Sequence, residues 1–185
     1  MRLFSIVFLG IITLFSCNQD RNPESQKSSS VVFFDLNTFF EKEIQSLSSI
    51  NSFTKTVTIN GRTEEQKLNK LDFENEFSIF TAADINRPAW SDKYAIDSLF
   101  NSQNQLTQIR YQAMDEQLKT KTLTIKFLNS KVVSIYIEKN MDNAVATSSQ
   151  TLYYEVNKGY TIQSQQDLSF SESRNFQIKV DYSPN

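Results

Sequence analysis

The chain has 185 residues, with 19 Lys and Arg against 21 Asp and Glu, a formal net charge of −2 and no histidine. This balance provides no basic surface for nucleic acid, so we expect no nucleic-acid partner. The lack of histidine excludes Ser-His-Asp and Cys-His catalysis and HExxH metal sites. Only three glycines occur, which excludes the Gly-rich loops that hold nucleotide phosphates. We therefore expect no cofactor and no metal site.

The first 16 residues have the features of a processing signal. Arg2 supplies a positive charge, and the apolar run from Leu3 to Ser16 is shorter than the roughly 18 residues that cross a bilayer. The run ends in Leu-Phe-Ser followed by Cys17, the single cysteine of the chain. This pattern resembles the bacterial lipobox, whose cysteine carries a diacylglycerol and becomes the acylated N-terminus. The resemblance implies lipid attachment at Cys17 and a membrane as partner; an ordinary signal peptide with an incidental cysteine is the alternative.

Residues 17–30 are expected to be the lipidated cysteine followed by a flexible tether. The stretch from residue 18 to 30 contains no apolar residue and is rich in Ser, Asn and Gln, so it cannot contribute to a core. Residues 31–185 are long enough to form a single globular domain.

The segment that follows the tether predicts an amphipathic helix. Its apolar residues recur at helical spacing, Asp35 is a plausible N-cap, and Phe34 and Phe39 have the spacing of a hydrophobic staple. Its polar face lacks the Lys and Arg enrichment of helices that lie on membranes. We expect this helix to pack on a sheet.

A hairpin and a second helix come next. Val57 and Ile59 alternate with threonines before Asn60-Gly61, a strong hairpin signal, and the polar return segment 62–68 is expected to be an edge strand or the start of a helix. The Phe73, Phe77, Phe80 and Asp84 positions then fall at helical spacing, and Pro88 is expected to end that helix.

From Tyr94 onward the hydrophobic period changes from helical to two. Seven segments read as strands, with turn signals such as Asn129-Ser130 between them, and the polar stretches 138–150 and 167–175 read as loops. We predict an α+β fold in which two helices pack on one face of a mostly antiparallel meander sheet of about six to eight strands. The second face should be polar.

Three stretches together resemble a group of lipoproteins from Bacteroidetes-type bacteria that has no assigned activity: "VTINGRTEEQKL", "DFENEFSIFTAADINRPAW" and "LYYEVNKGYTIQSQQ". The resemblance covers most of the chain after the signal. It implies an outer-membrane address in the cell envelope, with the periplasmic and surface faces both open, and it transfers no functional residue. Asp97-Ser98-Leu99 also resembles the O-glycosylation motif of this bacterial group.

Three residues are candidates for ligand binding. Trp90 follows a proline and could stack on a ligand, although a plug at the core edge is the simpler interpretation. Asp84 ends the Phe stripe, where a carboxylate faces the unfavourable C-terminal end of the helix dipole. The structural alternative is that it hydrogen-bonds the Asn86-Arg87 turn or pairs with Arg87. Tyr154 belongs to an aromatic strand that could bind sugar or lipid; Tyr153 and Tyr154 must point to opposite faces.

Carboxylates are the remaining candidates for catalysis. Asp72, Glu74 and Glu76 alternate near the second helix, and a pair of carboxylates could hydrolyse a glycosidic bond, although acids at a helix N-terminus are favoured by the dipole alone. We therefore expect a non-catalytic binding or accessory module of the outer membrane, partnered by an envelope protein or by a small apolar or glycan ligand. The alternative is a histidine-free hydrolase that acts on glycans.

Overall fold

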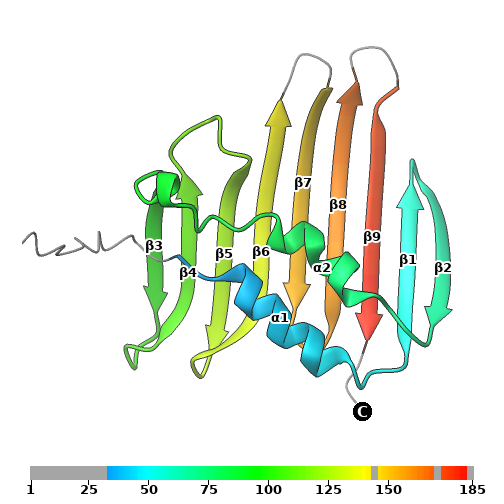
Figure 1. The fold of residues 1–185 in the computed structure, drawn as a ribbon, viewed down its shortest axis with the longest axis horizontal. Helices are drawn as coiled ribbons and strands as arrows, with labels where there is room; N and C mark the ends of the chain where they lie inside the picture. The colour runs from blue at the N-terminus through cyan, green and yellow to red at the C-terminus, as the bar shows by residue number, and fades with distance from the viewer. Residues whose placement is uncertain (1–32, 143–145, 169–171, 183–185) are drawn as a thin grey trace, which may run out of the picture.

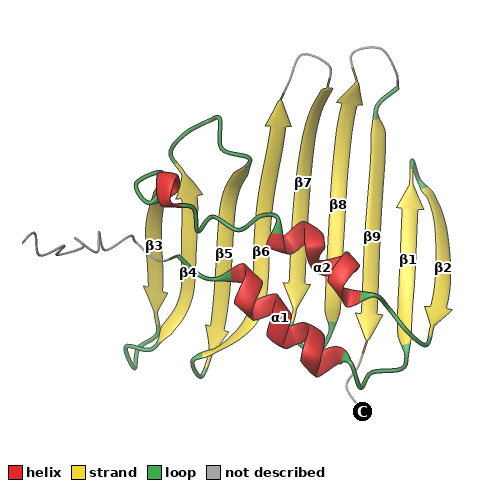
Figure 2. Cartoon of the chain, viewed as in Figure 1, coloured by secondary structure: helices red, strands yellow, loops and turns green. Residues whose placement is uncertain are grey.

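The computed structural model describes residues 33–142, 146–168 and 172–182. They form one antiparallel sheet with two α-helices packed on one of its faces, as Figure 2 shows. The predicted α+β class is confirmed, but the sheet has nine strands, so the expected six to eight was too low. The signal peptide, Cys17 and the tether lie outside the described residues, and none of the helices in the described part is long and apolar enough to cross a membrane.

Helix α1 (Leu36–Leu47) begins as its sequence predicts. The Asp35 side chain accepts a hydrogen bond from the Thr38 backbone N–H at 2.9 Å, which satisfies one of the free donors of the first turn. The rings of Phe34 and Phe39 lie 5.7 Å apart, so the predicted staple is present. These contacts fix the angle at which α1 enters and direct Phe40 into the core.

Helix α2 (Phe73–Thr81) is capped by Asp72 and buries Phe73, Phe77 and Phe80 against the sheet. It ends at Thr81, earlier than the Phe stripe predicts, and the 3₁₀ turn η1 (Pro88–Trp90) follows after an irregular segment. Asp84 lies in that segment and not on the helix, and its carboxylate accepts hydrogen bonds from the backbone N–H groups of Asn86 and Leu36.

The predicted hairpin is formed by β1 (Phe53–Ile59) and β2 (Arg62–Leu68). Asn60 and Gly61 take φ values of 48° and 83°, the left-handed conformation that a tight two-residue turn requires. Strand β2 is the first strand of the sheet order and most of its side chains are exposed and polar, which confirms the edge-strand interpretation.

The remaining strands form the predicted meander, in which each strand pairs antiparallel with the next (Figure 1). Asn129 and Ser130, at φ values of 50° and 61°, turn the chain between the third and fourth of these strands, as predicted. The seven strands are β3 (Tyr94–Phe100), β4 (Leu106–Ala113), β5 (Thr120–Leu128), β6 (Lys131–Asp142), β7 (Ala146–Glu155), β8 (Gly159–Leu168) and β9 (Arg174–Tyr182).

The hairpin joins the meander in a single sheet of order β2-β1-β9-β8-β7-β6-β5-β4-β3. Strand β1 pairs with β9 from Phe53 opposite Tyr182 to Ile59 opposite Phe176. The expected range was too low because the sequence of segment 62–68 allows either an edge strand or a helix start, and as β2 it brings the sheet to nine strands. The chain then crosses from β2 at one edge to β3 at the other by way of α2 and η1, which lie across the face of the sheet (Figure 1).

Four strands extend further than their hydrophobic pattern predicts. Strands β6 and β7 pair as far as Asp142 opposite Thr147, within the stretch 138–150 that was expected to be a loop. Strands β8 and β9 likewise extend into the predicted loop 167–175, of which residues 169–171 lie outside the described part. These strand ends carry polar residues on both faces, so hydrophobic alternation does not predict them.

Candidate functional site

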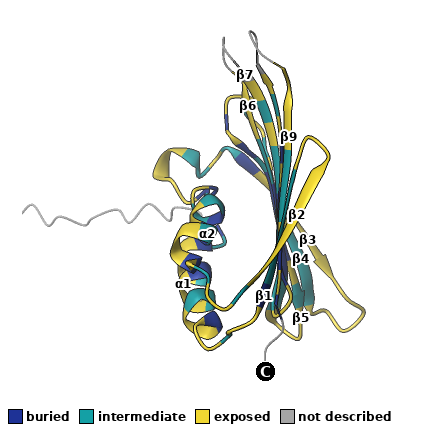
Figure 3. Ribbon diagram, turned by 90° about the vertical axis from the view of Figure 1, so that its right-hand side faces the viewer, coloured by how far each residue is buried: buried dark blue, intermediate teal, exposed yellow. Residues whose placement is uncertain are grey.

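The two faces of the sheet differ in cover and in composition. Both described helices lie on one side of the nine-stranded sheet, and within the described residues the opposite side has no covering element (Figure 3). Buried apolar side chains lie on the helix-covered face, where cross-strand partners such as Ile125 and Ile135, or Leu152 and Ile162, are almost fully enclosed. The opposite face, here called the open face, alternates with it along every strand and is mainly polar, as predicted.

Two tyrosines occupy the centre of the open face. Tyr136 of β6 lies directly opposite Tyr153 of β7, so the side chains are neighbours on the same face. The Tyr136 hydroxyl donates to Glu138 at 2.7 Å, and the Tyr153 hydroxyl donates to Glu155 at 3.2 Å. Tyr153 keeps 37 % of its surface exposed, whereas Tyr136 is half-buried. The pair is an aromatic platform with a carboxylate at each end.

The two platform hydroxyls are held in their neutral form. Burial and the hydrogen bond to Glu138 raise the pKa of Tyr136, and burial together with the Glu155 charge raises the pKa of Tyr153. The hydrogen bond from Lys158 lowers the pKa of Glu155, which keeps that carboxylate ionised. The platform therefore offers hydrogen-bond acceptors at its rim at neutral pH.

A polar groove adjoins the platform on the same face. Its volume is about 420 Å³, and it is open to solvent between β1, β9, β8 and β7. Thr151 connects the two features, since it faces Glu138 on one side and Gln163 on the other. The Gln163 amide donates to Gln177 at 3.1 Å. The groove lining contains no charged residue: Thr58, Gly61, Ser149, Thr151, Gln163, Ser164, Gln165, Asn175, Phe176 and Gln177.

The three candidates chosen from the sequence have separate positions away from this face. Trp90 is partly buried in η1 and packs on the core edge, its ring 6.5 Å from that of Tyr94. The Arg87 guanidinium covers the ring at 4.4 Å from its centroid. The plug interpretation agrees with this packing, and Arg87 occupies the ring face on which a ligand would stack.

Asp84 joins the segment after α2 to the start of α1. Its carboxylate accepts the Asn86 N–H at 2.6 Å and the Leu36 N–H at 3.2 Å. The predicted bond to the turn at Asn86 is therefore present, while Arg87 lies on Trp90. Asn86 continues the connection, accepting the Phe33 N–H at 2.8 Å. Both carboxylate oxygens of Asp84 thus have backbone partners, and its position is explained by chain architecture.

Tyr154 is fully buried between α1 and the sheet, so its ring is not accessible to a ligand. Its hydroxyl donates to Glu43 of α1 and accepts from the Tyr182 hydroxyl at 3.1 Å. Burial, with the neighbouring Tyr182 and Glu43, raises the pKa of Tyr154 strongly. Sequence alternation placed Tyr153 and Tyr154 on opposite faces, and the accessible member is Tyr153 and not the selected Tyr154.

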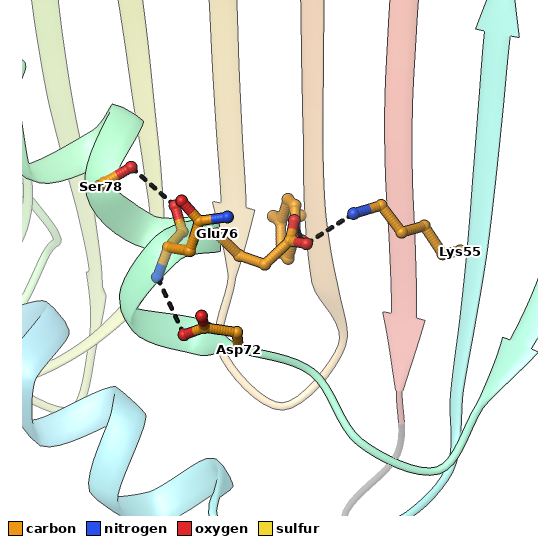
Figure 4. A network of polar contacts seen from close by, with 6 residues as sticks. Lys55, Asp72, Glu76 and Ser78 are labelled. Atoms are coloured by element: carbon orange, nitrogen blue, oxygen red, sulfur yellow. Dashed lines mark hydrogen bonds and ion pairs between the residues drawn. The ribbon is translucent and has the colours of Figure 1, made fainter.

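Two of the three carboxylates near α2, Asp72 and Glu76, have structural partners, whereas Glu74 is exposed. Glu76 accepts a hydrogen bond from the Lys55 ammonium at 2.5 Å, which joins α2 to β1 (Figure 4). It also accepts one from the Tyr160 hydroxyl, which joins α2 to β8. Asp72 caps α2 through the Asn75 N–H at 3.2 Å. Glu76 is enclosed, with 15 % of its side-chain surface exposed. Both acids therefore serve the attachment of α2 to the sheet.

The open face brings two other carboxylates to one surface, and their spacing can be derived from the register. Glu138 faces Thr151, and Glu155 lies four residues further along the same strand. With a rise of about 3.3 Å per residue and about 4.8 Å between strands, their backbone positions are about 14 Å apart. Glycosidases hold their two carboxyl groups about 5–9.5 Å apart. Among the described residues, no group of three or more His, Cys, Asp or Glu is placed to hold a metal ion.

In comparisons with known sequences, no protein-family model matches the chain, and no curated protein matches it either.

Proposed function

We propose that this protein is a non-catalytic binding module that is held at the outer membrane by a lipid on Cys17 and presents its open face to a glycan. The observation that carries the proposal is the direct pairing of Tyr136 with Tyr153 at the centre of a sheet face that neither of the described helices covers. Aromatic rings stack on the apolar faces of sugars, and the polar rim bonds the hydroxyls.

The groove beside the platform supports the same ligand class. Its 420 Å³ lies within the range of small-molecule sites, about 300–1,000 Å³. Amide and hydroxyl side chains can donate and accept at once, which suits a ligand whose hydroxyl groups do the same. A charged ligand would find no counter-ion among the groove side chains, so a neutral saccharide is the better match.

The alternative of a carboxylate-dependent glycan hydrolase receives less support. Asp72 and Glu76 are engaged by backbone and side-chain partners, and the open-face pair Glu138 and Glu155 is separated by about 14 Å at the backbone. A catalytic pair would have to approach to about 5–9.5 Å across a glycosidic bond. These positions therefore favour a protein that binds a glycan and does not hydrolyse it.

The ligand proposal is tested on the detergent-extracted full chain with an array of neutral bacterial and plant polysaccharides. We expect retention of at least one polysaccharide, and a roughly tenfold or larger loss of affinity in Tyr153→Ala, since one stacked aromatic contributes on the order of 1.5 kcal/mol. Phe100→Ala is the matched control, because Phe100 is an exposed aromatic on the distant edge strand β3. Equal binding by Tyr153→Ala and the parent chain would mean that the tyrosines serve strand pairing alone.

The anchor is tested separately. Cys17→Ala should abolish lipid labelling and move the protein to the soluble fraction, because the acyl chains supply about 0.8 kcal/mol for each buried methylene. Retention of Cys17→Ala in the membrane fraction after a carbonate wash would contradict the anchor.

A further inference from the structure

The helices cover only part of their face of the sheet. Strands β6, β7, β8 and β9 extend well beyond α2 toward the end that carries the β6–β7 connection, as Figures 1 and 3 show. The register places Lys139, Gln150 and Ser164 in one row on the helix-covered face of this extension. The next row outward contains Met141, Ser148, Gln166 and Arg174.

A small pocket of about 200 Å³ lies on this extension, lined by Lys119, Lys139, Ser148, Gln150 and Gln166 among others. Lys119 belongs to the segment that leads into β5, and its carbonyl accepts the Asn140 N–H at 2.9 Å. This bond fixes the Lys119 backbone beside the backbone of β6. The two lysines thus reach one pocket from adjacent backbone segments.

The positive charges of this pocket are not balanced within the described residues. The ion pairs among the described residues involve Lys55, Lys93, Lys158 and Lys179. Neither of the two pocket lysines takes part in one of these. Asp115, four residues before Lys119, lies 3.7 Å from Lys93. Asp84, which follows the Ala83 carbonyl that Thr120 bonds, accepts hydrogen bonds from two backbone N–H groups. Burial lowers the pKa of Lys139, and the charge of Lys119 lowers it further. Lys139 is half-buried and Lys119 is exposed. A partly dehydrated cation without a carboxylate costs free energy that an anion would recover.

A buried hydroxyl is also left free in the same row. Ser164 is 5 % exposed, and its Oγ has no hydrogen-bond partner among the described residues. It lies directly opposite Gln150, which lines the pocket. Buried polar groups are nearly always paired in native proteins, so this unpaired hydroxyl, in the same cross-strand row as Lys139 and Gln150, indicates that a hydrogen-bond partner is missing near this row.

We propose that the pocket between Lys119 and Lys139 binds a phosphate group. Two cations match a phosphate, which carries about −1.5 to −2 charges at neutral pH, better than they match a single carboxylate. The ammonium groups, the two Gln amides and the Ser148 hydroxyl provide donors for the phosphate oxygens. This site lies on the opposite side of the sheet from the tyrosine platform and is independent of the proposed glycan binding.

Inorganic phosphate is the first probe, titrated into the detergent-extracted full chain by calorimetry at low salt, with acetate as the comparison. We expect saturable phosphate binding that is at least tenfold tighter than acetate binding and that weakens with added salt. Lys139→Met should reduce phosphate affinity by roughly tenfold or more, Lys139→Arg should retain it within about threefold, and Lys67→Met, an exposed lysine on β2, should leave it unchanged.

Urea denaturation distinguishes a folding defect from a lost site. Met replaces the half-buried charge with an apolar group of similar length, so the urea midpoint of Lys139→Met should equal or exceed that of the parent chain. Vesicles of phosphatidylcholine with phosphatidic acid identify the source of the phosphate. If the protein binds these vesicles and free phosphate competes for the site, the ligand is a lipid headgroup. If the protein binds free phosphate but not the vesicles, the ligand is a soluble phosphate compound. Absence of saturable phosphate binding, or equal affinities in the parent chain and a folded Lys139→Met, would overturn the proposal.

Discussion

Tyr153 and Tyr154 are neighbours in the chain, yet they belong to different environments. The ring of Tyr154 is fully buried, 5.3 Å from Phe40 and 5.4 Å from Phe77. The ring of Tyr153 lies on the open face with 37 % of its surface exposed. The difference follows from the twofold period of a strand, which turns successive side chains to opposite faces. One tyrosine therefore stabilises the domain, and the next is free to meet a ligand.

The hydroxyl groups of the two faces differ in what they require. On the helix-covered face, burial removes water from the hydroxyls of Tyr154 and Tyr160, and these hydroxyls instead donate hydrogen bonds to Glu43 of α1 and Glu76 of α2. These bonds tie each helix to the sheet at one polar point inside an aromatic core. On the open face, Glu155 accepts a hydrogen bond from the Tyr153 hydroxyl at an exposed position, where water can replace either partner. The same residue pair, Tyr with Glu, is structural on one face and replaceable on the other.

The largest expected effect is on the stability of the helix-covered face. Phe77→Ala should lower the free energy of unfolding by about 3–5 kcal/mol, because it removes buried apolar surface and leaves a cavity among Phe40, Phe80 and Tyr154. Urea denaturation of the two purified chains measures this difference. An unchanged midpoint together with lost membrane or partner binding would mean that this face is an exposed docking surface.

Alkaline pH should separate the tyrosines of the two faces. Burial raises the pKa of Tyr94 and of Tyr182 to about 12, so both favour the protonated state in the folded protein. Each raised pKa contributes about 2–3 kcal/mol to the free energy of unfolding. This contribution is fully present below pH 10 and is lost as the pH rises toward 12. Absorbance at 295 nm and circular dichroism, followed together, should detect ionisation of these rings only with unfolding. Full ionisation of all seven tyrosines in a folded chain would contradict the burial.

Removing single hydroxyl groups sharpens the comparison further. Tyr154→Phe should cost about 1–3 kcal/mol, because the Glu43 carboxylate and the Tyr182 hydroxyl both lose a partner in an enclosed site. Tyr153→Phe should change the stability by less than about 0.5 kcal/mol, since water can replace its bond to Glu155. Equal costs for the two substitutions, measured in urea, would remove the distinction between the faces.

Local signals explain what the sequence could predict. The cap at Asp35, the turn at Asn60-Gly61 and the alternation of the strands each depend on residues within a few positions of one another, and the structure contains all three. Pairing between segments that are far apart in the sequence has no comparable local signal. The bond from Tyr154 to Glu43 spans 111 residues, and the pairing of β1 with β9 joins the two ends of the domain.

The candidate site was only partly predictable for the same reason. Alternation requires Tyr153 and Tyr154 to point apart but does not say which one faces the helices, because that depends on the register of β7 against β6 and β8. Tyr136 becomes part of the site only through its position opposite Tyr153. The groove residues Gln163 and Gln177 are ordinary solvent-facing strand residues in the sequence, and only the order of the sheet brings them together.

The most direct test of the central claim uses the full chain with ¹³C-labelled tyrosine rings and the polysaccharide retained most strongly on the array. Ring resonances are assigned with Tyr153→Phe, Tyr136→Phe, Tyr154→Phe and Tyr160→Phe. The account predicts that the saccharide shifts the signals of Tyr136 and Tyr153 in a saturable manner and leaves those of the buried Tyr154 and Tyr160 in place. Saturable shifts confined to Tyr154 and Tyr160, or binding that moves neither open-face ring, would contradict it.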